Sequence, residues 1–166
     1  LLRDRRYDRA GTLAARDEVL RVREYRHRDG SVTAELTWKG PTRLSRDGYK
    51  QREEIELAVG SAGGSAADLL AALGYEAVYT VDRWIETYAL EGASVRLEWY
   101  PRMDVLVEVE GTPDAIERAI VASGLARRGF TAEPLAIFAE RYRARGGAPA
   151  LSLGELGSET PSWERR

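Results

Sequence analysis

The stretch from Val105 to Gly111 constrains the fold most strongly, because it places two carboxylates inside an otherwise aliphatic run. Successive side chains of a strand point to opposite faces of a sheet. Glu108 and Glu110 therefore share one face, and the valines share the other. Taken alone, this pattern is also typical of an ordinary amphipathic strand that turns its polar side to water.

Several other segments alternate in the same way and change that interpretation. Leu20 to Tyr25 places Arg21 and Arg23 on one face, and Val32 to Lys39 places Lys39 on a face with other polar residues. We expect strands over residues 20–25, 32–39, 52–57, 77–88, 94–100 and 105–111. The basic strands come early in the chain and the acidic strands late, which favours two sets of charges that face each other.

The charges on these faces form one basic and one acidic set. The bases are Arg21, Arg23, Lys39, Arg52, Arg83 and Arg96, and the acids are Glu54, Glu56, Glu98, Glu108 and Glu110. Burying a charge costs several kcal/mol unless it is paired or binds an ion. A closed sheet with a charged lumen that holds a ligand therefore fits the pattern better than a solvated sheet.

Three segments carry helix signals. Ser65 to Gly74 has a Ser N-cap and a Gly stop, Thr112 to Gly124 has Pro at its first helical position, and Pro134 to Arg145 ends at two glycines. We predict an α+β fold: a closed or nearly closed antiparallel β-barrel with a charged lumen, surrounded by helices, over residues 1–147. Residues 148–166 are rich in Ser, Gly and Glu and are expected to form a loose tail.

Composition excludes several classes of function. A net charge of −2 argues against a nucleic-acid coat or a membrane-surface helix, and no apolar run reaches the roughly 18 residues of a membrane span. Cysteine is absent, which excludes thiol nucleophiles and fits a cytoplasmic protein. His27 is the single histidine and falls at a turn, so a Ser–His mechanism has no good candidate.

The remaining pattern indicates a polyphosphate ligand. Carboxylates two residues apart on one strand are hard oxygen ligands suited to Mg²⁺ or Mn²⁺. Arg and Lys side chains facing them would bind phosphate oxygens. The apolar outer faces would then need cover from the helices or from a second subunit, and a homodimer is one expectation.

The order of these motifs resembles the CYTH superfamily, the triphosphate tunnel metalloenzymes. The matching pieces are Leu20-Arg21-Val22-Arg23, Leu36-Thr37-Trp38-Lys39-Gly40-Pro41, Arg52-x-Glu54-x-Glu56, Leu73-Gly74-Tyr75 and Glu108-x-Glu110-Gly111. The resemblance implies an eight-stranded antiparallel tunnel that binds a triphosphate with a divalent metal. Three function classes stay open: a class IV adenylyl cyclase that forms cyclic AMP and pyrophosphate from ATP, a triphosphatase, and a non-catalytic polyphosphate-binding module.

The resemblance also implies roles for individual residues. Glu108, Glu110 and Glu98 are the expected metal ligands, for Mg²⁺ or Mn²⁺. Arg21, Arg23, Lys39, Arg52 and Arg83 are the expected triphosphate-binding residues, and Glu54 and Glu56 are further lumen acids.

The chain departs from the family pattern at three places. The family begins with a Glu-x-Glu-x-Lys strand, and no such motif precedes Tyr7, so we expect either that this strand lies outside the sequence or that the protein is inactive. The family's Lys-x-Arg pair is Arg83 and Ile85 here, which removes one phosphate contact. Glu98 stands where the family has Asp, so the carboxylate arm is one methylene longer.

Overall fold

The computed structural model describes residues 1–46, 48–60 and 64–164. The chain divides into two compact units. Unit 1 comprises Leu1–Ser45 and Lys50–Asp82, and unit 2 comprises Arg46–Tyr49 and Arg83–Arg166. The division falls inside one long strand, between Asp82 and Arg83, where the sequence pattern indicated no boundary. Each unit is described by itself below.

Unit 1 is built from the first half of the sheet. Its strands are β1 (Leu2–Asp8), β2 (Val19–Arg26), β3 (Val32–Lys39), β4 (Arg43–Leu44), β5 (Lys50–Gln51) and β6 (Glu54–Val59), with the 3₁₀ helix η1 (Ala14–Arg16) and helix α1 (Gly64–Ala72). β1 pairs with β2, β2 with β3, β3 with β6 and β4 with β5, all antiparallel.

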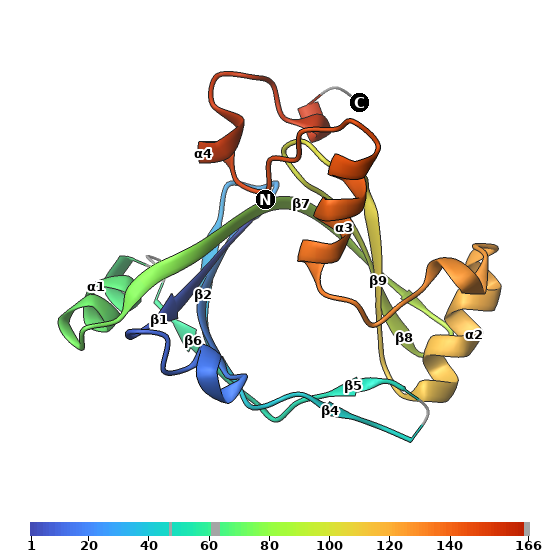
Figure 1. Cartoon of the computed structure of the whole chain (residues 1–166), viewed down its shortest axis with the longest axis horizontal. Coiled ribbons are helices and arrows are strands. Elements are labelled where there is room, and N and C mark those ends of the chain that lie inside the picture. Colours follow the sequence, from blue (N-terminus) through green and yellow to red (C-terminus); the bar gives the residue numbers. More distant parts are fainter. Residues whose placement is uncertain (47, 61–63, 165–166) are drawn as a thin grey trace. The chain divides into compact units, whose positions relative to one another are not determined.

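Unit 2 contains the last strands of the seven-stranded sheet. Strand β7 (Glu76–Leu90) runs through both units, and β8 (Ala93–Trp99) and β9 (Leu106–Glu110) follow it in antiparallel pairing. The helices are α2 (Pro113–Ser123), α3 (Leu135–Ala144) and α4 (Leu153–Leu156), with the 3₁₀ helices η2 (Arg127–Gly129) and η3 (Ser162–Glu164). Figure 1 shows α2 lying along β8 and β9, which it contacts.

The prediction of an α+β fold with antiparallel strands is confirmed, but the closed barrel is not. Seven strands are hydrogen-bonded in the order β6-β3-β2-β1-β7-β8-β9. Within the described residues this order has two ends, β6 and β9. The sheet is therefore open in its hydrogen bonding.

In each unit a helix covers the apolar face of the strands. In unit 1, Ala66 and Leu70 of α1 pack on Tyr7 and Val22. In unit 2, the cluster consists of Ala93 and Val95 from β8 with Ala115 and Ala119 from α2, and Val107 and Val109 pack against it. The helices cover these faces as the alternation predicted, although Ile55 and Leu57 of β6 stay exposed. The proposed Ser65 cap lies outside the described side chains.

The helix signals of α2 are confirmed in detail. The Thr112 hydroxyl accepts a hydrogen bond from the backbone N–H of Ala115, and Gly124 ends the helix at a φ of 71°. Glycine adopts a positive φ without steric strain because it has no Cβ, so the helix ends at Gly124. Among the described residues, none of the helices combines the length and apolar character that crossing a bilayer requires.

At the chain's ends the structure adds one strand and corrects one prediction. Leu2–Asp8 forms a regular strand, in a segment for which no element was predicted. The segment from 148 is no loose tail, because Ala150 is fully buried and pairs with Arg102 in a β-bridge. Leu156 of α4 is also buried, and the Ser162 hydroxyl donates to the Tyr100 carbonyl at 2.6 Å. These contacts hold the segment to unit 2.

Candidate functional site

A charged face covers one side of the sheet in unit 1. We call it the unit-1 charged face, and its residues are Asp4, Arg21, Arg23, Glu35, Lys39, Glu54 and Glu56. The strand registers place them together: Asp4 is opposite Arg23, Arg23 is opposite Glu35, and Lys39 is opposite Glu54. Five charged side chains that were predicted to share one face therefore do so: Arg21, Arg23, Lys39, Glu54 and Glu56.

Two buried arginines lie around one carboxylate on this face. Arg23 donates from Nε to Asp4 Oδ2 at 3.1 Å, and Arg21 Nη1 lies 3.7 Å from the same oxygen. The side chains of all three residues are less than a tenth exposed. Burial strengthens charge interactions, so the one Asp4 carboxylate interacts strongly with both arginines.

Lys39 adds a third cation to the same neighbourhood. Its Nζ donates to Glu54 Oε1 at 2.5 Å from the directly opposite position. Burial lowers the pKa of Lys39, the hydrogen bond to Glu54 raises it, and the positive charges of Arg21 and Arg23 lower it again. The charges of Arg21 and Arg23 are therefore close enough to Lys39 to affect its pKa.

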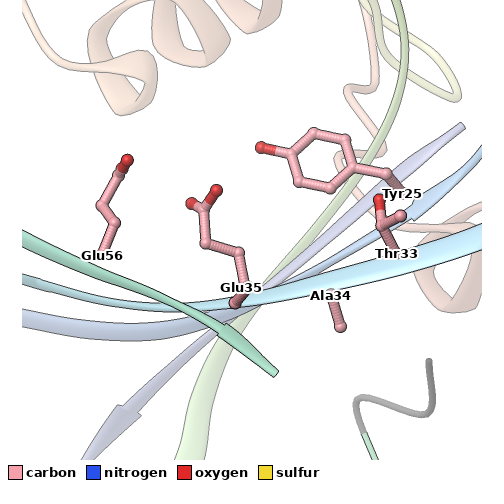
Figure 2. A pocket seen from close by; sticks show the side chains of 6 residues that line it. Tyr25, Thr33, Ala34, Glu35 and Glu56 are labelled. Carbon is pink, nitrogen blue, oxygen red and sulfur yellow. The ribbon is translucent and has the colours of Figure 1, made fainter. Parts of the chain in front are cut away.

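A pocket lies over strands β2, β3 and β6 of the same unit. It has a volume of about 230 Å³ and is lined by Tyr25, Thr33, Ala34, Glu35, Glu56 and Ala58. Figure 2 shows the Tyr25, Glu35 and Glu56 side chains pointing to one side of the strands, with Ala34 pointing away. The Thr37 hydroxyl, fully buried, donates to Glu35 Oε1 at 2.9 Å. The pocket thus offers hydroxyl and carboxylate oxygens beside Arg23.

Arg52 was expected on this face, and its hydrogen bonds to Asp17 and Thr42 are with residues outside the set named above. It precedes β6, which begins at Glu54, so it does not follow the alternation of that strand. Its Nη2 donates to Asp17 Oδ1 at 2.6 Å and its Nε to the Thr42 hydroxyl at 2.7 Å. The backbone N–H of Thr42 also donates to Asp17, and this bond is the main cause of the lowered pKa of Asp17. Arg52 therefore ties two loops together.

Unit 2 has its own charged face, formed by Arg83, Arg96, Glu98, Glu108 and Glu110. We call it the unit-2 charged face. Glu98 is buried, and its Oε2 accepts from Arg83 Nη1 at 3.0 Å and from the Tyr100 hydroxyl at 2.6 Å. Burial raises the pKa of Glu98, Arg83 lowers it, and the nearby negative charge of Glu108 raises it. Burial, followed by the charge of Glu98, also raises the pKa of Tyr100.

The two acids of the Glu-x-Glu motif both contact Arg96. Arg96 Nη1 lies 3.2 Å from Glu108 Oε2, and Nη2 lies 3.0 Å from Glu110 Oε2. Among the residues that the structure describes, no group of three or more His, Cys, Asp or Glu side chains could hold a metal ion. Glu98, Glu108 and Glu110 share a face as predicted, and each of the three carboxylates contacts an arginine on that face.

The sequence interpretation missed four participants. Asp4 lies on the strand that was not predicted, and Tyr25 and Glu35 were assigned no role although each alternates correctly with Arg23 or Lys39. Tyr100 directly follows β8 and was not linked to Glu98. Glu35 could have been identified from the sequence, because it lies four residues before Lys39 on the same strand and therefore on the same face.

Comparisons with known proteins support the fold. No family model matches the chain, and no curated protein does either. Among solved structures, the PH1819 protein of Pyrococcus horikoshii OT3 is 23% identical with a TM-score of 0.58, covering 99% of this chain and 84% of that one. A conserved hypothetical protein of Pyrococcus furiosus is 17% identical with a TM-score of 0.64, and the match covers 82% of this chain and 81% of that one. The PH1012 protein of P. horikoshii OT3 is 15% identical with a TM-score of 0.59, and the match covers 82% of this chain and 80% of that one.

Proposed function

We propose that this chain binds the triphosphate group of a small molecule on the unit-1 charged face. The observation that carries the proposal is the grouping of Arg21, Arg23 and Lys39, three cations that are largely buried and close enough to influence one another. Each of the three cations has a carboxylate partner, Asp4 or Glu54, and the phosphate oxygens of the ligand would bind the same cations beside these carboxylates.

The arrangement suits an extended anion better than a single phosphate. Arg21 and Arg23 are two apart on β2, and Lys39 projects from the neighbouring β3, opposite Val19. Same-face side chains on one strand start roughly 6.5 to 7 Å apart. A chain of linked phosphates would present oxygens to each cation in turn, and the planar guanidinium groups can hold them in bidentate fashion.

The wider proposal is that the chain is an enzyme acting on that triphosphate, most like a class IV adenylyl cyclase. Its support is the order of motifs shared with the CYTH superfamily, in which Arg21, Arg23 and Lys39 occupy the matching basic positions. Cations placed around phosphate oxygens stabilise the charge that develops when a phosphate ester bond breaks. With water as the nucleophile the same arrangement would be a triphosphatase.

A non-catalytic polyphosphate-binding module is the second candidate function. It is favoured by the unit-2 charged face, where Arg96 contacts both carboxylates of the Glu-x-Glu motif. A module of this kind would keep the cations of unit 1 and bind the ligand without turnover.

Two measurements test these proposals. Tripolyphosphate at millimolar concentration should raise the melting temperature, because a ligand that binds only the folded state stabilises it by mass action. Cyclic AMP, pyrophosphate and inorganic phosphate should then be assayed from ATP, tripolyphosphate and thiamine triphosphate, with Mg²⁺ or Mn²⁺ present. Stabilisation without any product would select the binding module, and no stabilisation would reject triphosphate binding altogether.

A homodimer remains a separate proposal. Ile55 and Leu57 of β6 are both more than half exposed, and β6 is one end of the strand order among the described residues. An apolar end strand is a common place for a second copy to pack. Sedimentation velocity across micromolar concentrations tests this, and a strictly monomeric profile would count against it.

A further inference from the structure

We infer that the guanidinium group of Arg96 is the resident cation of the Glu108–Glu110 pair, and that this pair takes no divalent metal ion. The inference concerns the acids to which the motif resemblance assigns a metal. It rests on the geometry of the unit-2 charged face and does not depend on triphosphate binding.

The strand register brings Arg96 to both carboxylates. Arg96 on β8 is directly opposite Glu108 on β9, and Glu110 is opposite Ser94, two residues further along the same face. The two terminal nitrogens of one guanidinium group therefore reach one carboxylate each, at 3.2 and 3.0 Å. The fixed fork of an arginine side chain is suited to contacts of this type.

The third acid is held in a separate group. Glu98 uses Oε2 for both Arg83 and Tyr100, and only its buried Oε1 makes no hydrogen bond within the described residues. Mg²⁺ and Mn²⁺ favour several oxygen ligands around one point. Here each of the three carboxylates already has a positively charged partner, so an ion would have to displace guanidinium groups to assemble such a set.

The position of the Arg96 charge leads to the same conclusion. Its guanidinium group contacts both carboxylates, and a divalent ion held between them would lie in close contact with that positive charge. With Arg96 removed, two carboxylates would remain on one face with no cation between them. That arrangement is the one expected to attract a hard divalent ion.

Titration with Mn²⁺ alone, followed by electron paramagnetic resonance, tests the inference on the whole chain without triphosphate. The wild-type chain should bind Mn²⁺ no more tightly than millimolar at this face. Arg96→Met should bind Mn²⁺ at least tenfold more tightly, and adding Glu108→Gln and Glu110→Gln to that variant should remove the gain. Arg118→Met is the control, because Arg118 also belongs to unit 2 but donates to the backbone carbonyl of Glu91.

Each outcome decides the matter. Micromolar binding by the wild type that Glu108→Gln and Glu110→Gln weaken would overturn the inference, and so would a folded Arg96→Met variant without any gain. If Arg96→Met does not fold, the wild type and the double glutamine variant are compared, where equal Mn²⁺ binding supports the inference and a loss in the variant overturns it. Triphosphate binding is measured separately, so failure of the proposed function would leave these results unchanged.

Discussion

The guanidinium group of Arg23 donates to the carboxylate of Asp4 from the directly opposite position on the neighbouring strand, and both side chains are buried. Arg21 lies beside the same carboxylate oxygen. Asp4 thus occupies, as an internal anion, the neighbourhood in which we propose that the triphosphate binds. The first two predictions follow from this relationship.

Asp4→Asn should destabilise the protein and strengthen triphosphate binding. Removing one partner of a buried ion pair typically costs about 3–5 kcal/mol, because the other charge stays buried. Tripolyphosphate should restore much of this loss, so the ligand-induced rise in melting temperature should be larger in the variant. Glu24→Gln is the control, since Glu24 pairs with the exposed Arg26 on β2. An unchanged or smaller rise in Asp4→Asn would contradict the prediction.

Arg23→Ala should weaken tripolyphosphate binding by roughly ten- to a hundredfold, the effect of losing a charge-assisted hydrogen bond worth about 1.5 to 3 kcal/mol. Isothermal titration calorimetry measures this directly. Arg26→Ala on the same strand removes an equal charge at an exposed position and should leave the affinity nearly unchanged. Equal losses in the two variants would mean that only the net charge matters.

Triphosphate affinity should fall at alkaline pH through Lys39. Burial lowers the pKa of Lys39 below its usual value of 10.5, and only the protonated amine attracts the anion. The affinity should therefore be present at neutral pH and be lost as the pH rises through this lowered pKa. Lys39→Met should bind more weakly at pH 7 and lack this part of the fall, and comparing the two proteins cancels the ligand's own titration. Parallel pH profiles would remove Lys39 from the binding site.

Two adjacent leucines of α1 should behave differently. Leu70 is buried against Tyr7 and Val22, whereas Leu69 is more than half exposed. Leu70→Ala should cost about 2–5 kcal/mol of unfolding free energy, from lost burial and the cavity left behind. Leu69→Ala should change it by less than about 0.5 kcal/mol. Urea unfolding of both variants checks whether α1 covers the apolar face of unit 1.

Leu156→Ala should also destabilise the chain, by about 2–5 kcal/mol, although it lies in the segment whose composition is typical of a loose tail. Leu156 is buried in α4, next to the segment that pairs with Arg102. Val121→Ala is the control, since Val121 is 80% exposed in the same unit. A melting temperature equal to that of the control would show that the burial of Leu156 adds nothing to stability.

The sequence predicted those strands in which apolar and charged residues alternate strictly. β2, β3 and β9 were found within about one residue of their bounds, and their charged faces followed from the parity of Arg21, Lys39 and Glu108. β1 was not predicted because four of the five residues in Leu2-Arg3-Asp4-Arg5-Arg6 carry charge, which leaves no apolar alternation. Its pairing with β2, a long-range contact, decides its conformation.

The pairing of specific charges could not be read from the sequence. Arg96 and Glu98 are two residues apart on one strand, so the sequence shows that they share a face. Which residue of β9 lies opposite Arg96 depends instead on the path of residues 100–105 between the strands. The same limit applies to Arg52, whose parity matched Glu54 although its chain position lies before β6. In both cases the conformation of a loop decides which residues the arginine contacts.

The division of the chain inside β7 bears on how this protein can be dissected. A cut between Asp82 and Arg83 would sever a single 15-residue strand, and Arg46–Tyr49 would stay with the fragment that carries the other unit. Neither unit is a contiguous piece of polypeptide, so truncation cloning cannot deliver either one intact. Point substitutions in the whole chain are therefore the sound route to separating the contributions of its two charged faces.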